Sequence, residues 1–282
     1  MIETNIVAVG NLSFAVDTAG PVAGSPVLLL HGFPETRRMW RHQLEALGRA
    51  GYRAIAPDQR GYSPGARPEG VEHYGTDRLV SDALSLMGAL GAPRFHLVGH
   101  DWGGQLAWLI AARHADRVLS LSVLSRPHPA AFAKAMLDDK AQVERSRHHR
   151  AFREDDAITR MRAAKLKPLR DALERQGVPR GDADEYMRAL SEPGAIEGAM
   201  NWYRAGNIAA SSVPSVSVPT LYVWGDQDAT VGTTAAELTA KYVTGFYRFV
   251  VIEDAGHFVV DQFPARVSEL LLEHIESAAS RL

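Results

Sequence analysis

An aspartate flanked by glycines is the residue of this chain best placed to act as a nucleophile. Residues 99–104 have the sequence Gly-His-Asp-Trp-Gly-Gly and lie between an apolar run and a helical pattern. This is the spacing of a nucleophile elbow, a sharp strand-to-helix turn that needs small residues two positions before and after the nucleophile. The helix N-terminus also favours a negative charge there. Asp101 is therefore predicted to attack carbon, whereas an isolated aspartate at such a place would be a helix cap.

A loop that could hold an oxyanion follows another apolar run. Residues 31–35 have the sequence His-Gly-Phe-Pro-Glu and come directly after the apolar residues 27–30. A tight turn there could aim the backbone amide of Phe33 at the same point as the amide of Trp102, which would form an oxyanion hole. Pro34 makes a cis bond before it plausible in such a turn. Glu35 is assigned no chemistry.

Two later segments supply a base and an acid. His257 lies just past the last apolar run with strand character, and Trp-Gly-Asp-Gln-Asp at residues 224–228 follows the run before it. With eleven histidines in the chain, this position singles out His257, because a triad built on an elbow has the chain order nucleophile, acid, histidine. Asp228 is predicted to orient His257, which would deprotonate a water. Asp226 is interpreted as a turn former.

Alternating strands and helices must position these residues. Strand character is found at residues 6–9, 12–17, 27–30, 53–56, 95–98, 118–124, 220–224 and 247–252, with a turn at residues 10–11. Apolar residues at helical spacing predict helices over residues 36–50, 78–90, 102–115 and 264–277. This alternation is typical of an α/β fold, here a mostly parallel eight-stranded sheet with helices on both faces.

The alternation stops in the middle of the chain. Residues 126–213 are helical in pattern, rich in arginine and acidic residues, and lack a convincing strand. We therefore expect one core, formed by residues 1–125 and 214–282, with residues 126–213 inserted as an all-α lid. Residues 214–219, which begin and end with proline, are interpreted as the linker back into the core.

Composition narrows the class of protein. The 282 residues are 46% hydrophobic and 23% charged, with a formal net charge of -2 and no cysteine, which is typical of a globular protein without disulfides or thiolate sites. The charge suggests no nucleic-acid partner, and no apolar run approaches the roughly 20 residues that span a bilayer. We expect a cytoplasmic protein without a membrane partner, cofactor or metal site, and leave a homodimer open.

Taken together, the motifs resemble those of the epoxide hydrolases with the α/β-hydrolase fold. The resemblance covers residues 25–125 and 215–275, and an aspartate nucleophile is a trait that this group shares with haloalkane dehalogenases. Residues 58–63, Asp-Gln-Arg-Gly-Tyr-Ser, are similar to a family loop that is structural. The resemblance implies a small-molecule epoxide as substrate, converted to a vicinal diol through a covalent ester on Asp101.

The resemblance also assigns a proton donor to the lid, where the family usually has two tyrosines. Residues 200–204, Met-Asn-Trp-Tyr-Arg, are similar to the segment that holds the second one, which makes Tyr203 the ring-opening donor; its alternative role is ordinary aromatic packing. Alignment of residues 142–148 puts His148 where the first tyrosine is usual. His148 could donate an N–H with pH-sensitive strength, since its ordinary pKa is about 6.5, or it could be an exposed member of a charged helix with His149.

Two other functions remain open from the sequence. Haloalkane or haloacid dehalogenation could use the same nucleophile, with Trp102 as the first halide donor. The usual second donor is missing, however, because Phe33 occupies its place in the loop, and Gln105 stands where an arginine would hold a haloacid carboxylate. A low-turnover ligand-binding relative is the third hypothesis, although a pure binder would not need Asp101, Asp228 and His257.

Overall fold

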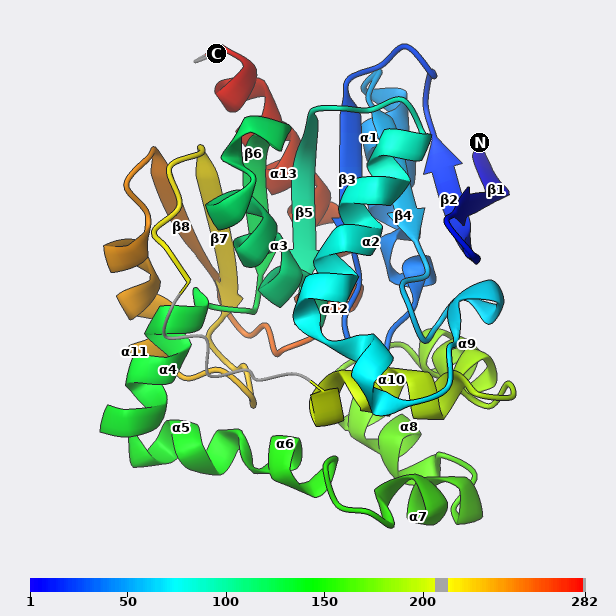
Figure 1. The fold of residues 1–282 in the computed structure, drawn as a ribbon. Helices are drawn as coiled ribbons and strands as arrows, with labels where there is room; N and C mark the ends of the chain where they lie inside the picture. The colour runs from blue at the N-terminus through cyan, green and yellow to red at the C-terminus, as the bar shows by residue number, and fades with distance from the viewer. Residues whose placement is uncertain (206–212, 281–282) are drawn as a thin grey trace.

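Eight strands form one sheet in the computed structural model, which describes residues 1–205 and 213–280 (Figure 1). Its order is β1-β2-β4-β3-β5-β6-β7-β8, with antiparallel pairing of β1 with β2 and of β2 with β4, and parallel pairing from β4 to β8. The predicted mostly parallel eight-stranded α/β sheet is therefore confirmed. The strands are β1 (Ile2–Val9), β2 (Leu12–Ala19), β3 (Pro26–Leu30), β4 (Arg53–Pro57), β5 (Phe95–His100), β6 (Val118–Leu124), β7 (Thr220–Gly225) and β8 (Tyr247–Ile252).

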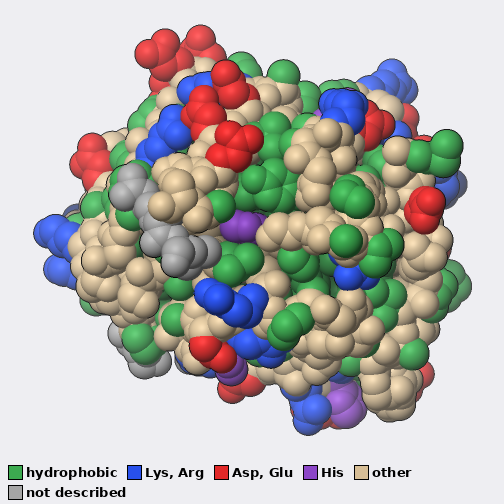
Figure 2. Space-filling view, turned by 90° about the horizontal axis from the view of Figure 1, so that it is seen from above, with side chains coloured by type: hydrophobic (Ala, Val, Ile, Leu, Met, Phe, Trp, Pro, Cys, Tyr) green, Lys and Arg blue, Asp and Glu red, His purple; other side chains and the backbone are tan. Residues whose placement is uncertain are grey.

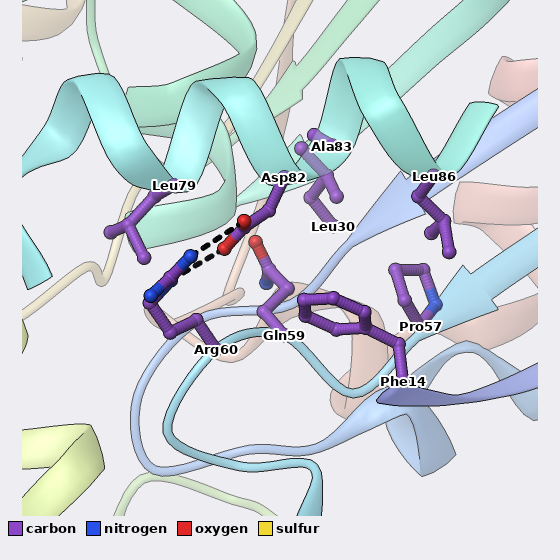
Figure 3. A pocket seen from close by; sticks show the side chains of 9 residues that line it. All are labelled: Phe14, Leu30, Pro57, Gln59, Arg60, Leu79, Asp82, Ala83 and Leu86. Atoms are coloured by element: carbon purple, nitrogen blue, oxygen red, sulfur yellow. Dashed lines mark hydrogen bonds and ion pairs between the residues drawn. The ribbon is translucent and has the colours of Figure 1, made fainter. Parts of the chain in front are cut away.

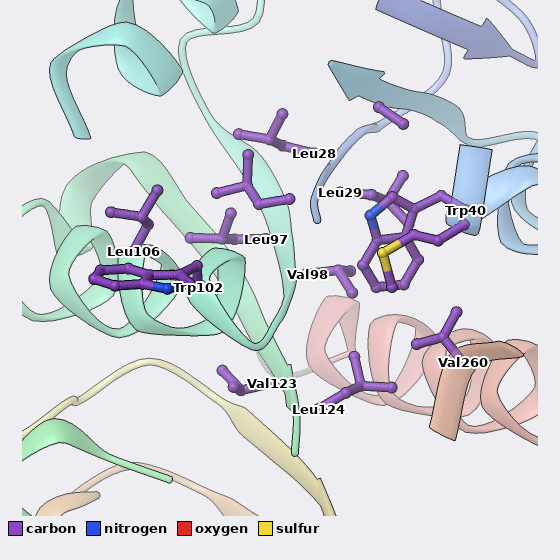
Figure 4. Packing of buried hydrophobic residues seen from close by; sticks show 14 of the residues in the cluster. Leu28, Leu29, Trp40, Leu97, Val98, Trp102, Leu106, Val123, Leu124 and Val260 are labelled. Carbon is purple, nitrogen blue, oxygen red and sulfur yellow. The ribbon is translucent and has the colours of Figure 1, made fainter. Parts of the chain in front are cut away.

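Helices cover both faces of the sheet. Helices α1 (Arg41–Arg49) and α13 (Pro264–Ala279) pack together on one face, and α2 (Thr76–Ala89) and α3 (Trp102–Arg113) lie on the other (Figure 1). Between these layers the central strands are buried on both sides, as Figure 4 shows for Leu97 and Val98 of β5. Short elements complete the core: η1 (Arg37–Trp40), η2 (Pro64–Ala66), η3 (Val71–Tyr74), η4 (Ala115–Arg117), α11 (Thr233–Leu238), η5 (Thr239–Tyr242) and α12 (Val259–Gln262).

In the described residues between β6 and β7, the regular elements are all helices. These helices lie beyond the carboxyl ends of the parallel strands, at the bottom of Figure 1. Residues 206–212, the end of the predicted lid, and residues 281–282 lie outside the described part of the chain. The helices are α4 (Pro129–Asp138), α5 (Lys140–Arg145), α6 (Arg147–Ala151), α7 (Ala157–Ala163), α8 (Lys167–Arg175), α9 (Arg180–Leu190) and α10 (Ala195–Ala205).

Some element bounds differ from the sequence prediction. β1 begins at Ile2 rather than residue 6, because its antiparallel register pairs Ile2 with Ala19 and continues without a break to the hairpin turn. Its early residues are exposed on the sheet edge, so they carry no apolar pattern that would reveal a strand. The helix predicted over residues 36–50 is divided into η1 and α1.

The loop after β4 connects the core to the helices outside it. Arg60 makes a two-pronged ion pair with Asp82 of α2, and its carbonyl accepts a hydrogen bond from the indole N–H of Trp202 in α10. The pair borders a small cavity of about 10 Å³ that also touches Phe14 (Figure 3). Because that volume is only about one water molecule in size, this cavity holds no ligand larger than a water.

Figure 2 views the end of the molecule opposite to α5–α9, and acidic and basic side chains are interspersed there. Within residues 1–205 and 213–280, no helix has the length and apolar character required to cross a bilayer.

Candidate active site

The turn between β5 and α3 presents Asp101 in a strained conformation. Its φ and ψ are 49° and -117°, a region that residues with a side chain rarely adopt. A Cβ atom on Gly99 would lie 2.4 Å from the Gly103 carbonyl oxygen, and one on Gly103 would lie 2.0 Å from the Leu30 carbonyl oxygen. Both positions thus exclude any side chain, which is the physical reason for the glycine spacing read from the sequence.

The loop after β3 brings a backbone amide to the carboxylate. The amide of Phe33 donates to Oδ1 of Asp101 at 3.0 Å, and the peptide bond between Phe33 and Pro34 is cis, as expected. A Cβ on Gly32 would lie 2.5 Å from the same oxygen, so this approach also depends on glycine. Trp102 is the first residue of α3, where backbone amides have no partner within the helix. One carboxylate oxygen is therefore held by an amide, and the other remains for chemistry.

His257 lies between two carboxylates. Its Nε2 is 3.5 Å from Oδ2 of Asp101, and its Nδ1 is 3.0 Å from Oδ2 of Asp228. Asp228 is fully buried and also accepts hydrogen bonds from the amides of Thr230 and Val231, at 2.7 and 2.9 Å. The structure thus brings together the three residues that the sequence placed after β5, β7 and β8. Asp226, by contrast, is exposed, and its Oδ1 accepts a hydrogen bond from the backbone amide of Asp254, 28 residues further along the chain.

Mutual charges set the ionisation of these groups. Burial disfavours the charge on Asp101, but its contact with His257, the charge of His100 and the Phe33 amide lower the pKa of Asp101 below its usual range. Burial also disfavours an imidazolium, yet the charges of Asp228 and Asp101 raise the pKa of His257 to about 10. Both shifts favour a carboxylate on Asp101 beside an imidazolium on His257. A charged Asp101 therefore disfavours the neutral imidazole that could accept a proton.

The triad opens into a cavity of about 250 Å³ that Tyr203 also lines. The Tyr203 ring, in α10, packs against Phe33, Trp102 and Phe152 with centroid separations of 5.4, 5.2 and 5.0 Å. Burial, followed by the charge of Asp101, raises the pKa of Tyr203 well above its ordinary value. Its hydroxyl therefore keeps its proton at any physiological pH and is available as a donor inside the cavity.

His148 lines the same cavity but is not free to donate from both nitrogens. It is half-buried in α6, and its Nδ1 lies 3.1 Å from the carbonyl oxygen of Arg145. A carbonyl only accepts, so a neutral His148 ring carries its proton on Nδ1 and has a lone pair on Nε2. Burial lowers the pKa of His148, although the nearby charge of Asp101 opposes this. His148 thus offers an N–H to the cavity only when it is an imidazolium.

Comparison with known proteins is consistent with this geometry. A family profile for the alpha/beta hydrolase fold matches residues 25–264. The chain is 33% identical to epoxide hydrolase 4 of Mus musculus over 96% of its own length and 78% of that protein. It is 32% identical to epoxide hydrolase A of Mycobacterium tuberculosis over 98% of its length and 96% of that protein. The chain belongs to the epoxide hydrolases of the α/β-hydrolase fold.

Solved structures of this epoxide hydrolase family superpose closely. An epoxide hydrolase from metagenomes of hot environments matches with a TM-score of 0.88 and 29% identity, covering 98% of this chain and 99% of the other. The Bacillus megaterium epoxide hydrolase, solved with an inhibitor, has the same TM-score at 25% identity and covers 96% of this chain and 100% of the other. The helices outside the core are therefore part of the shared architecture.

Several residues that support the triad were not predicted. Oγ1 of Thr230 lies 2.6 Å from Nδ1 of His257 and donates to Oδ1 of Asp228 at 2.8 Å. From α5, Gln142 accepts from the Gly232 amide, and Arg145 donates to the Asp228 carbonyl at 2.7 Å. A threonine two residues after an aspartate is a local signal for a turn in which the carboxylate accepts from the threonine amide. The contacts from α5 have no such signal in the sequence.

A second unpredicted contact lies beneath the nucleophile. His100 is fully buried, its Nδ1 is 2.7 Å from Oε2 of Glu35, and its Nε2 is 2.8 Å from the carbonyl oxygen of His257. Ser125 donates to the same carbonyl at 2.7 Å. Glu35, to which the sequence assigned no chemistry, therefore contacts the residue next to Asp101. It also belongs to the network that holds the backbone of His257.

Proposed function

We propose that this member of the epoxide hydrolases converts a small epoxide to a vicinal diol through an ester on Asp101. The observation that carries the proposal is the placement of Asp101, His257 and Tyr203 around one cavity of about 250 Å³. The helices of residues 126–205 act as the lid, because α6, α8 and α10 all contribute residues to the wall of this cavity.

The first half-reaction opens the ring. Oδ1 of Asp101 is held by the Phe33 amide, so Oδ2 is the oxygen that attacks an epoxide carbon. The carbon–oxygen bond breaks as the departing oxygen takes the phenolic proton of Tyr203 and becomes a hydroxyl. His148 assists as a second donor when it is protonated. The product is an ester whose carbonyl oxygen, Oδ1, already lies in the oxyanion hole.

The second half-reaction follows from the loss of one charge. Once Asp101 is a neutral ester, the carboxylate that stabilised the His257 imidazolium from the cavity side is gone. The pKa of His257 then falls, and its proton can return to the Tyr203 phenolate. Neutral His257, oriented by Asp228, takes a proton from a water that attacks the ester carbonyl, and the Phe33 and Trp102 amides stabilise the oxyanion. Collapse breaks the bond to the substrate oxygen, which takes the proton of the new carboxyl group to complete the diol and leaves Asp101 as a carboxylate beside the His257 imidazolium.

Dehalogenation could use the same nucleophile, but the site fits it less well than epoxide hydrolysis. It would need N–H donors around a halide, and Phe33 offers none from its side chain. A buried phenol such as Tyr203 serves an oxygen leaving group, which must be protonated as it departs, and is not required for a halide.

Trapping the ester tests the proposal. His257→Gln removes the base of the second half-reaction, so incubation with an epoxide should leave Asp101 carrying the mass of the substrate, detected by mass spectrometry of the digested protein. Asp101→Asn is the matched control and should remain unmodified. Unmodified Asp101 in the His257→Gln variant, across aromatic, aliphatic and fatty-acid epoxides, would contradict the proposed function.

A further inference from the structure

Two buried carboxyl groups face each other behind the active site. Glu35, in the loop after β3, is fully buried, and Asp261, in α12, is 7% exposed and hydrogen-bonded to it. Oε1 of Glu35 and Oδ2 of Asp261 are both buried, and in the described part of the chain neither accepts a hydrogen bond from an N–H or hydroxyl group. Within residues 1–205 and 213–280, no lysine or arginine forms an ion pair with either group. Two ionised carboxylates in contact would repel each other strongly in a buried environment, so one of the two groups must be protonated.

The remaining oxygens show where that proton lies. The hydroxyl of Tyr186, in α9, donates to Oδ1 of Asp261 at 2.9 Å. Oε2 of Glu35 is 2.7 Å from Nδ1 of His100, and Nε2 of His100 faces the carbonyl oxygen of His257. His100 thus has an acceptor on each side, which fits an imidazolium that donates twice and balances one ionised carboxylate. The other carboxyl group, Asp261, must then hold its proton on Oδ2 and donate it to Glu35.

The charges around Asp261 favour this arrangement. Burial, followed by the charge of Glu35, raises the pKa of Asp261 well above its ordinary value. The titratable groups that face it are Glu35, Tyr186 of α9 and Asp182 of α9, and Asp182 is itself paired with arginines of η1 and α1. Burial disfavours a charged His100, but Glu35 raises its pKa. The network therefore contains one neutral acid, one carboxylate and one imidazolium.

We propose that Asp261 is a positioning residue of the hydrolytic half-reaction, in which its protonated carboxyl group fixes the charge state of the Glu35–His100 pair. This inference rests on the proposed function, because it assigns a further residue to that reaction. His100 acts through its Nε2–H, which holds the carbonyl oxygen of His257 and so fixes the backbone of the base of that half-reaction. Through Tyr186, the same network connects α9 of the lid to the backbone of the catalytic histidine.

Stability as a function of pH tests the shared proton without any substrate. The side-chain amide introduced by Asp261→Asn would donate to Glu35 and accept from Tyr186, but it cannot titrate. In the wild type, protonated Asp261 contributes fully to the free energy of unfolding below the ordinary aspartate pKa of about 4. That contribution is lost as the pH rises toward the higher pKa of Asp261 in the folded protein. The urea midpoint of the wild type should therefore fall relative to Asp261→Asn between pH 4.5 and 8. A relative midpoint that is constant or rises with pH would show an ordinary ionised aspartate and overturn the proposal.

Single-turnover kinetics test the positioning role. Asp261→Ala removes the donor to Glu35, and ester hydrolysis should slow by about tenfold, as expected when a catalytic group is displaced, with ester formation nearly unchanged. Asp261→Asn should restore most of that rate, and Asp226→Asn, which changes an exposed aspartate, is the matched control. Equal ester hydrolysis in the alanine variant and the wild type would overturn the role. Failure of the proposed function itself would appear separately, as no ester on Asp101 in the His257→Gln variant.

Discussion

The hydroxyl of Thr230 lies between the acid and the base of the triad. Its oxygen is 2.6 Å from Nδ1 of His257 and donates its proton to Oδ1 of Asp228, while the Thr230 amide binds the same oxygen. Nδ1 of His257 lies 3.2 Å from Oδ1 and 3.0 Å from Oδ2 of Asp228, and Thr230 fixes the plane of that carboxylate. A residue outside the predicted triad thus determines the orientation of two residues within it.

Replacing Thr230 by valine should slow the second half-reaction. Valine keeps the shape of threonine but loses a hydrogen bond to a charged group, which contributes about 1.5 kcal/mol or more, equivalent to about tenfold in rate. We expect that decrease in the rate of ester hydrolysis, measured by single-turnover kinetics, with little change in ester formation. Thr230→Ser keeps the hydroxyl and should remain close to the wild type. A valine variant with unchanged kinetics would exclude an orienting role.

Tyr203→Phe should slow ring opening more than ester hydrolysis. The phenol is the buried donor that keeps its proton at physiological pH, so its loss should lower the rate of ester formation from an epoxide by about a hundredfold, within the range of general acid catalysis. Hydrolysis of an ester already formed should slow less, because loss of the Asp101 charge lowers the pKa of His257 and its proton can then pass to water instead of the phenolate. Stopped-flow fluorescence can separate the two rates. The test also separates the two candidate functions, because release of halide from a haloalkane by an enzyme of this kind should not depend on the phenol.

His148→Tyr should change the pH profile of ring opening. Nδ1 of His148 faces a carbonyl oxygen, so the ring donates to the cavity only as an imidazolium, and burial lowers its pKa below 6.5. Its assistance is therefore present at acidic pH and is lost as pH rises through that lowered value. A tyrosine keeps its proton throughout this range. We expect faster ester formation in the variant at pH 7 to 8 and a flatter profile between pH 5 and 7; identical profiles would show that His148 does not act as a donor.

The sequence predicted the parts of the site that depend on local geometry. The elbow at Asp101 requires glycine at positions 99 and 103 because carbonyl oxygens lie where their Cβ atoms would be, and that steric need is visible as a spacing. The positions of His257 and Asp228 follow from the order of the strands, since parallel strands end on one side of the sheet. Both signals are local or topological, so one sequence is enough to reveal them.

The contacts that hold the site from a distance could not be predicted in this way. Glu35 and Asp261 are far apart in the chain, and each has an ordinary local interpretation as a loop or helix-turn residue. Their proximity depends on how α12 returns beneath the loop after β3, which no spacing encodes. The same is true of Arg145, whose contact with the Asp228 carbonyl depends on how α5 packs against the core.

Acid should destabilise the protein through histidines that are buried away from the active site. Burial lowers the pKa of His96 in β5 and of His274 in α13 to about 4. Because these folded-state values lie below the unfolded value of about 6.5, the unfolded chain binds more protons, and stability falls as pH decreases from about 6.5 to 4. One such histidine contributes on the order of 3 kcal/mol to this loss. His274→Gln should therefore flatten the dependence of the free energy of unfolding on pH in that window, measured by urea denaturation. The control is His73→Gln, which changes a half-buried histidine on the surface and should leave the slope close to that of the wild type; an equal slope in the His274 variant would contradict the assignment.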